Sequence, residues 1–158
     1  MGRRREILCI DDDLQSLNVR RMLFESMGYQ VWTELDAQQG LRSFQEHPVD
    51  AVVMDYEMPG MNGGEAAAAM KAIRPEVPVL ILSALPWLPE GAPQESIDGF
   101  IHKGEPLKVL AGRISQIVPA EDEPEIETGP AGSLGGALGT FFAHVAGALS
   151  PRKKVEVH

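Results

Sequence analysis

Short apolar runs of strand length alternate with segments of helical periodicity over residues 6–118. The runs are rich in branched side chains and are bounded by turn formers, which is typical of buried strands. Short connections between alternating strands and helices predict a doubly wound α/β fold, in which a five-stranded parallel sheet carries helices on both faces. The expected strands are Glu6–Ile10, Tyr29–Thr33, Ala51–Asp55, Val77–Leu82 and Gly99–His102. The expected helices are Leu14–Met27, Ala37–Glu46, Glu65–Ile73 and Leu107–Val118.

The first predicted helix has the pattern of an amphipathic helix. Val19, Leu23 and Met27 recur at a spacing of four, and Leu17 and Phe24 lie seven apart, as in an amphipathic helix. Asp13 precedes this pattern and Gly28 follows it. We therefore expect Asp13 to cap the amino end of the helix and Gly28 to end it.

The segment between Leu85 and Ser96 breaks the alternation. A helix is expected here, but three prolines and a glycine, Pro86, Pro89, Gly91 and Pro93, exclude a regular helix of any length. We predict a fourth helix that is irregular or shortened. Trp87 in this segment either is an exposed contact for a partner or folds back over the edge of the sheet.

The composition excludes several classes of protein. The chain has 158 residues, 44% of them hydrophobic and 23% charged, as in soluble globular proteins. Its formal charge of -9 argues against direct binding of nucleic acid. The single cysteine, Cys9, excludes a disulfide framework, and Arg3–Arg5 lead into too short an apolar run for a signal peptide. We expect a cytoplasmic protein.

The composition changes after residue 118. Residues 119–133 combine acidic residues with prolines and are expected to form a linker without fixed structure. Residues 134–158 form a tail rich in glycine and alanine, whose apolar part, Leu134–Leu149, is shorter than the roughly 20 residues of a membrane span. We expect a tail that is disordered alone, or helical only against a partner or a membrane surface.

Polar side chains stand where four of the five predicted strands end. Asp11 and Asp12 follow the first strand, Asp55 ends the third, Ser83 follows the fourth and Lys103 the fifth. The carboxyl ends of parallel strands meet at one edge of a sheet, which is where ligands bind in open α/β sheets. We therefore expect these five side chains to lie together.

This combination of residues is typical of phosphoryl chemistry. Three converging carboxylates require a cation, and a set of few oxygen ligands suits Mg²⁺. Lys103 could neutralise a phosphoryl oxygen, Ser83 could donate a hydrogen bond to another, and Asp55 could act as a carboxylate nucleophile that forms an acyl phosphate. Each residue also has a structural explanation: the acids could favour a helix N-terminus, Ser83 could simply end a strand, and Lys103 could be a surface charge. Their occurrence together favours the functional interpretation.

Four motifs resemble the receiver domain of bacterial two-component response regulators. They span residues 6–118 and consist of Ile7–Asp13, Met54–Gly63, Leu82–Ala84 and Phe100–Lys103. The resemblance implies a flavodoxin-like fold and a phosphorylation-switched domain rather than an enzyme, with at most self-phosphorylation from small donors and self-dephosphorylation. It also implies that a sensor histidine kinase or a phosphotransfer protein supplies the phosphoryl group.

The resemblance assigns a role to each matching position. Asp55 would accept the phosphoryl group, which Ser83 and Lys103 would contact. Mg²⁺ would be bound by Asp12 directly, by Asp11 largely through water, by Asp55 and by the backbone carbonyl of Glu57. Phe100 occupies the position of the aromatic residue whose rotamer follows the switch.

Two positions depart from the family pattern. Gly104 follows Lys103 where the family usually has proline, which could change the peptide that orients the lysine. The segment from Ser83 to Lys103 is slightly short, and its prolines replace a helix that normally forms much of the face for dimers or targets. The usual dimer is therefore in doubt for this chain.

Three functions are compatible with these residues. Nothing basic or similar to a helix-turn-helix follows residue 118, so a receiver with output through protein contact, to an unknown downstream protein and not to DNA, is the leading hypothesis. A Mg²⁺-dependent phosphatase with Asp55 as nucleophile is a second, but Glu57 stands where such enzymes usually place an aspartate. A binding module that works without phosphorylation is the third, and the disrupted fourth helix keeps it open.

Overall fold

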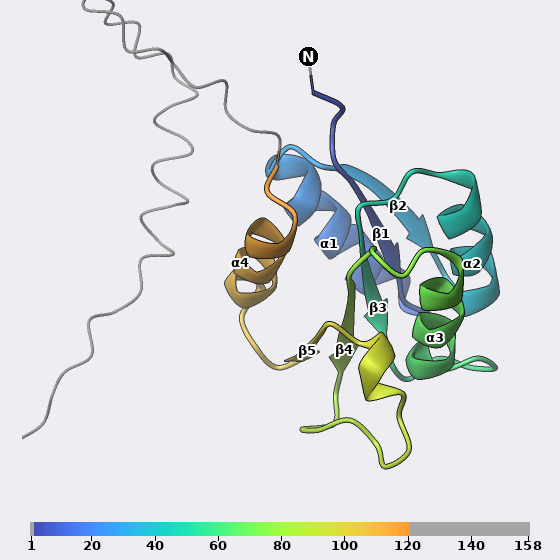
Figure 1. The fold of residues 1–158 in the computed structure, drawn as a ribbon. Helices are drawn as coiled ribbons and strands as arrows, with labels where there is room; N and C mark the ends of the chain where they lie inside the picture. The colour runs from blue at the N-terminus through green and yellow to red at the C-terminus, as the bar shows by residue number, and fades with distance from the viewer. Residues whose placement is uncertain (1, 121–158) are drawn as a thin grey trace, which may run out of the picture. The chain divides into compact units, whose positions relative to one another are not determined.

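A computed structural model describes residues 2–120 of the chain (Figure 1). In chain order the elements are β1 (Glu6–Ile10), α1 (Leu14–Ser26), β2 (Gln30–Glu34), α2 (Ala37–Glu46), β3 (Ala51–Asp55), α3 (Gly63–Ile73), β4 (Val79–Ser83), a short 3₁₀ helix η1 (Gln94–Ser96), β5 (Gly99–His102) and α4 (Leu107–Ile117). The predicted alternation of strands and helices is confirmed.

The five strands form one parallel sheet in the order β2-β1-β3-β4-β5. The strand order reverses between β1 and β3, which are neighbours although β2 lies between them in the sequence. A parallel sheet of this order is doubly wound, as predicted, and its ligand-binding crevice lies at the carboxyl ends of the strands where the order reverses.

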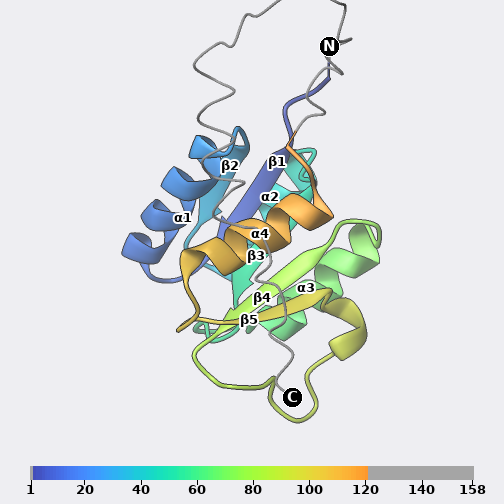
Figure 2. The same cartoon turned by 90° about the vertical axis from the view of Figure 1, so that its left-hand side faces the viewer.

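Alternate residues of the strands supply two separate cores, one on each face of the sheet. On one face, side chains such as Cys9 and Val53 pack with Phe24 of α1 and Ile114 of α4. On the other, side chains such as Met54 pack with α2 and α3. Figures 1 and 2 show this arrangement, with α1 and α4 on one side of the sheet and α2 and α3 on the other. Successive strand side chains point to opposite faces, so both faces of the central strands are apolar.

Several element boundaries differ from the predictions by one or two residues. Strand β2 begins one residue after Tyr29, strand β4 begins at Val79 rather than at Val77, and α3 begins at Gly63 rather than at Glu65. The early start of α3 has a local cause. The Asn62 side chain accepts a hydrogen bond from the Glu65 N–H at 2.9 Å, and the Glu65 carboxylate accepts one from the Asn62 N–H at 3.0 Å. This capping box holds two glycines in the first turn that the sequence alone assigned to a loop.

The buried face of α1 also differs from the predicted pattern. Its buried residues are Leu17, Arg20 and Phe24, whereas Val19 is 46% exposed. Leu23 and Met27 are only partly buried against the core. Because Leu17, Arg20 and Phe24 lie at spacings of three and four, they share one stripe, and an arginine occupies its centre. The predicted N-cap is confirmed, since the Asp13 side chain accepts hydrogen bonds from Gln15 and Ser16.

The segment between β4 and β5 contains no regular α-helix, as predicted. Apart from the single 3₁₀ turn Gln94–Ser96, it is a loop (Figure 2). Trp87 in this loop is 72% exposed, so it does not fold back over the sheet edge.

The predicted linker and tail lie almost wholly outside the described residues, which end at residue 120. Within residues 2–120, no helix is long and apolar enough to cross a membrane.

Candidate functional site

Three aspartates meet at the carboxyl edge of the sheet. Asp11 and Asp12 follow β1, Asp55 ends β3, and β1 and β3 pair directly with Ile10 opposite Met54. One carboxylate oxygen from each aspartate lies within 4.8 Å of the other two. Asp11 and Asp55 are buried and Asp12 is exposed. The structure thus brings together the three side chains among the predicted metal ligands, and one of them is open to solvent.

Lys103 reaches this cluster from the end of β5. Its N–H donates a hydrogen bond to the Ser83 carbonyl at 2.8 Å, which fixes the backbone beside β4. Its Nζ atom lies 2.9 Å from Asp55 Oδ2 and 3.6 Å from Asp11 Oδ2. Burial lowers the pKa of Lys103, but the hydrogen bond with Asp55 and the charges of both aspartates outweigh burial, so the pKa is raised above its ordinary value. Lys103 is therefore a permanent positive charge at neutral pH.

The Asp55 side chain lies in a buried environment that disfavours its negative charge. Burial raises the pKa of its carboxyl group to about 6, and the negative charge of Asp11 acts in the same direction. The interaction with Lys103 lowers the pKa and so opposes these effects. A cation bound to the aspartates would act in the same way as Lys103, because a nearby positive charge favours the carboxylate form.

Ser83 lies at the end of β4, beside Asp55, and is fully buried. Its hydroxyl donates a hydrogen bond to the carboxylate of Glu57 and accepts one from the Leu85 N–H at 3.0 Å. The Glu57 N–H in turn donates to Asp55 Oδ1 at 3.3 Å. Burial alone would raise the pKa of Glu57, but hydrogen bonds from Ser83 and from backbone amides lower it below its usual value.

Phe100 lies apart from the carboxylates, on edge strand β5. It is half-buried and packs against the core on the α2 and α3 side of the sheet. It pairs in register with Ile81 of β4, two residues before Ser83. The structure thus places the predicted switch residue next to the strand that carries Ser83.

The residues at the three-aspartate cluster fit a divalent cation. Their donors are all oxygen atoms, which hard cations such as Mg²⁺ prefer. Asp11 Oδ2 is buried and accepts no hydrogen bond from the described residues, and only cationic side chains face it there. Asp11, Asp12 and Asp55 would hold the ion through their side chains. The backbone hydrogen bond of Glu57 to Asp55 keeps Glu57 beside this cluster.

The sequence analysis missed two features of the site. Arg20 of α1 is buried, and its Nη2 atom lies 2.9 Å from Asp11 Oδ2. Glu57 enters the site through its side chain as well as its backbone, because its carboxylate accepts the Ser83 hydroxyl. An arginine within an otherwise apolar helical stripe was the available signal for Arg20. No signal in the sequence pairs Glu57 with Ser83.

The departure at Gly104 has a structural counterpart. The Gly104 N–H, which a proline would lack, donates to Nδ1 of His102 at 3.1 Å. The other ring nitrogen of His102 lies 2.9 Å from the Ala84 carbonyl. With Nδ1 accepting, Nε2 carries the proton and donates to Ala84. The His102 ring thus links the residue after Lys103 to the residue after Ser83.

Comparison with known proteins agrees with the fold. The profile of the response regulator receiver domain matches residues 7–115. The transcriptional regulatory protein GlrR of Escherichia coli K12 is 30% identical over 123 residues, which are 74% of this chain and 28% of GlrR. PrrA of Mycobacterium tuberculosis, also a transcriptional regulatory protein, is 36% identical over 78 residues, 49% of this chain and 34% of PrrA. The chain therefore spans about a third or less of these relatives.

Solved structures show the same fold. A response regulator receiver domain protein from Clostridium thermocellum has a TM-score of 0.64 and 28% identity, covering 72% of this chain and 94% of that protein. The response regulator TrrA of Thermotoga maritima, solved in complex with Mg²⁺ and BeF, has a TM-score of 0.68 and 21% identity, covering 72% and 99%. Because the family profile matches well over half of the chain, the chain belongs to the response regulator receiver domain family.

Proposed function

We propose that this receiver domain accepts a phosphoryl group on Asp55, with Mg²⁺ bound beside it. The observation that carries the proposal is the placement of Asp55, a buried carboxylate that ends β3 within reach of Asp11, Asp12 and the Lys103 ammonium. Asp12, Asp11 and Asp55 are the proposed side-chain ligands of Mg²⁺, and the Glu57 carbonyl is the proposed backbone ligand. Bound Mg²⁺ would neutralise part of the charge on the phosphoryl oxygens.

The proposed reaction transfers the phosphoryl group from a phosphohistidine of a sensor histidine kinase or a phosphotransfer protein. An Asp55 carboxylate oxygen attacks phosphorus, the new O–P bond forms, the P–N bond breaks, and the imidazole leaves. The burial that raises the pKa of Asp55 disfavours its carboxylate form, whereas Lys103 at 2.9 Å favours it. Lys103 therefore supports the nucleophile before transfer and the phosphoryl group after it.

Ser83 is proposed to contact the phosphoryl group once it is present. Its hydroxyl is engaged with Glu57, so the phosphoryl oxygens would compete with the Glu57 carboxylate for this donor. Ser83 and Leu85 are linked by a hydrogen bond, which connects any movement of Ser83 to the loop that follows β4. Phe100 on the neighbouring strand is the proposed side chain that responds to this movement.

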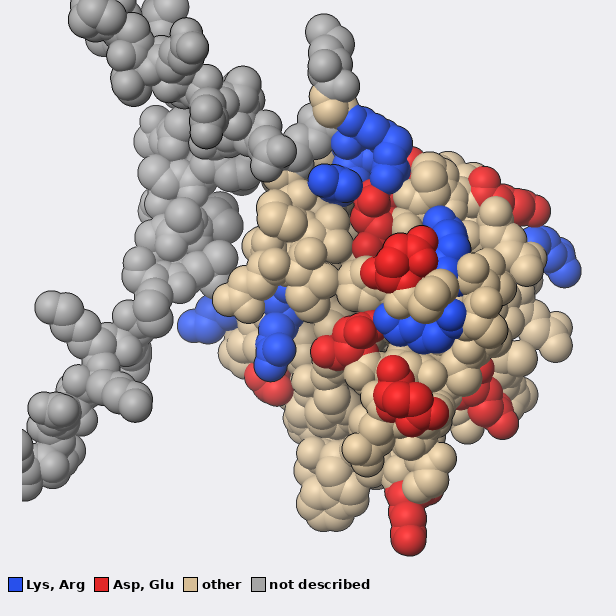
Figure 3. All heavy atoms as spheres, in the orientation of Figure 1, with Lys and Arg blue, Asp and Glu red and all other residues tan. Residues whose placement is uncertain are grey.

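The proposed output is contact with a downstream protein in the cytoplasm rather than direct binding of nucleic acid. The net charge of -9 supports this, and acidic and basic side chains are interspersed on the face seen in Figure 3. The names of GlrR and PrrA connect those longer proteins with transcription, and both extend well beyond the matched region.

The experiment is to incubate the protein with Mg²⁺ and acetyl phosphate and to measure its intact mass. We expect one added phosphate, which is absent in Asp55→Asn. Asp36→Asn is the matched control, because Asp36 caps α2 at the same edge of the sheet and asparagine also caps helices. Continuous hydrolysis of varied phosphomonoesters would support a phosphatase instead. The absence of an adduct with every donor would support a module that works without phosphorylation.

A further inference from the structure

Arg20 is a buried charge that the proposed phosphoryl transfer does not require. The residue is 5% exposed and lies between Leu17 and Phe24 on the stripe of α1 that packs against the sheet. A buried guanidinium group is strongly destabilising unless charges or hydrogen bonds compensate it. The groups that face Arg20 therefore indicate what it does.

Asp11 supplies the compensating charge. Arg20 Nη2 lies 2.9 Å from Asp11 Oδ2, the oxygen that also lies 3.6 Å from the Lys103 ammonium. Neither Asp11 Oδ2 nor Arg20 Nη1 has a hydrogen-bond partner among the described residues. The close contact is thus an attraction between charges without well-aligned hydrogen bonds, and Nη1 is a buried donor without a partner.

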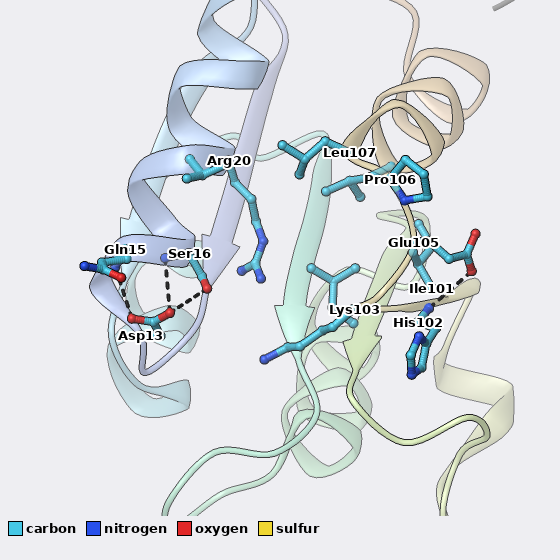
Figure 4. A pocket seen from close by; sticks show the side chains of 13 residues that line it. Asp13, Gln15, Ser16, Arg20, Ile101, His102, Lys103, Glu105, Pro106 and Leu107 are labelled. Atoms are coloured by element: carbon cyan, nitrogen blue, oxygen red, sulfur yellow. Dashed lines mark hydrogen bonds between the residues drawn. The ribbon is translucent and has the colours of Figure 1, made fainter.

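The side chain of Arg20 enters the site from the cleft between α1 and the segment after β5. This cleft has a volume of about 340 Å³ and is lined by Arg20 and Lys103 among others. Figure 4 shows the Arg20 side chain extending from α1 toward the end of the Lys103 side chain. Two cations from different elements thus converge on Asp11.

The charges at the site show how the Arg20–Asp11 contact would affect metal binding. Asp11, Asp12 and Asp55 carry three negative charges, and Lys103 and Arg20 carry two positive ones. A divalent cation at the three aspartates would share Asp11 with Arg20 and would be repelled by the guanidinium group at short range. Such a cation can gain the full attraction of Asp11 only when Arg20 withdraws.

We propose that Arg20 competes with the divalent cation for Asp11, so that metal binding requires the Arg20–Asp11 ion pair to open. This inference rests on the proposed function, since it takes the three aspartates as the metal site. In the absence of metal, Arg20 neutralises a buried carboxylate and stabilises the domain. With metal, it lowers the affinity of the site relative to the same site without the arginine.

Isothermal titration with MgCl₂ tests the proposal directly. Arg20→Leu removes the charge and retains an apolar side chain, and we expect it to bind Mg²⁺ about tenfold or more tightly than the wild type. Arg20→Lys keeps the charge and should change the affinity less. The matched control is Arg21→Leu, because the neighbouring Arg21 has an exposed side chain that contacts Thr33 and Glu25 outside the site. Its affinity should stay within about twofold, since exposed charges are screened.

An equal or weaker affinity in Arg20→Leu would overturn the proposed competition and leave Arg20 a purely structural role. Failure of the metal site itself gives a different result, because then neither protein binds Mg²⁺, or Asp12→Asn binds it as well as the wild type.

If Arg20→Leu does not fold, the wild type supplies a second measurement. Mg²⁺ should shift the NMR signal of the Arg20 Nε–H group, assigned through Arg20→Lys, and leave the Arg21 signal in place. An unmoved Arg20 signal at saturating Mg²⁺ would also overturn the proposal.

Discussion

Lys103 contacts two carboxylates with one ammonium group, and this determines what its removal should do. It is not the proposed nucleophile, so Lys103→Ala should still form the phosphate adduct on Asp55. The adduct should form more slowly, by about ten- to a hundredfold, because a charge-assisted contact that supports the carboxylate is lost. The measurement is the time course of intact mass with acetyl phosphate.

Phosphorylation of the Lys103→Ala variant should not change the conformation of the loop after Ser83. Without the ammonium group, no positive side chain among the described residues links Asp55 to the segment after β5, so amide NMR signals of the loop after Ser83 should change little on phosphorylation. Lys108→Ala, which removes an exposed lysine from α4, should behave as the wild type. A wild-type loop response in Lys103→Ala would exclude the proposed role of the lysine.

At the residue scale, the sequence could predict which side chains meet but not how all their charges are compensated. Asp11, Asp55 and Lys103 end parallel strands, so topology alone brings them to one edge. The contact of Arg20 with Asp11 depends on which face of α1 packs against the sheet. The apolar pattern that predicted this helix did not define that face, because it included Leu17 and Phe24, which are buried, as well as Val19, which is exposed. A buried charge is recognisable only together with its partner, and this partner belongs to another element.

At the scale of elements, the strands and helices with clear boundaries were predictable. Helix α2 and the strands β1, β3 and β5 have the bounds that the sequence indicated, because prolines, glycines and acidic turns delimit them. The start of α3 was not predictable from helix propensity, since two glycines occupy its first turn. The capping box and the packing of this turn against β3 override that preference.

The first turn of α3 lies so close to β3 that only glycine fits at position 63. A Cβ atom on Gly63 would lie 2.5 Å from the Asp55 carbonyl oxygen and 2.8 Å from Tyr56 Cα, and both are backbone atoms. We expect Gly63→Ala to lower the free energy of unfolding by about 1–3 kcal/mol, measured by urea denaturation. The packing at position 63 therefore helps to hold β3, the strand that carries the proposed phosphoacceptor Asp55.

Gly64→Ala is the control for this prediction. A Cβ atom at Gly64 would meet only side chains, at 3.0 Å or more, and these can move by a few tenths of an ångström. Its effect should be less than about 1 kcal/mol, because alanine also favours the helix. Equal stabilities of the two variants would show that α3 can shift away from β3.

At the scale of the whole domain, one hydrogen bond joins two distant parts of the chain. Tyr29 is fully buried in the core beneath α1 and α4, and its hydroxyl donates to the Val118 carbonyl at 2.6 Å. This contact fixes the carboxyl end of α4 to the segment that enters β2, 89 residues away. Residue 118 is also the predicted end of the folded domain, a boundary that stays a prediction.

Tyr29→Phe should reveal this contact through the pH dependence of stability. Burial raises the pKa of the Tyr29 hydroxyl above its ordinary value. Below the pKa of the unfolded chain, about 10, the hydroxyl remains protonated in both states, and its hydrogen bond should contribute about 1 kcal/mol that Tyr29→Phe lacks. As the pH rises above 10, the unfolded chain ionises first and this contribution is lost. Urea denaturation from pH 7 to 11 should therefore show the two stability curves converging. Tyr56→Phe, which removes the hydroxyl of a half-buried tyrosine, should show no such convergence. Parallel curves for Tyr29→Phe would mean that the buried hydroxyl does not tie α4 to the sheet.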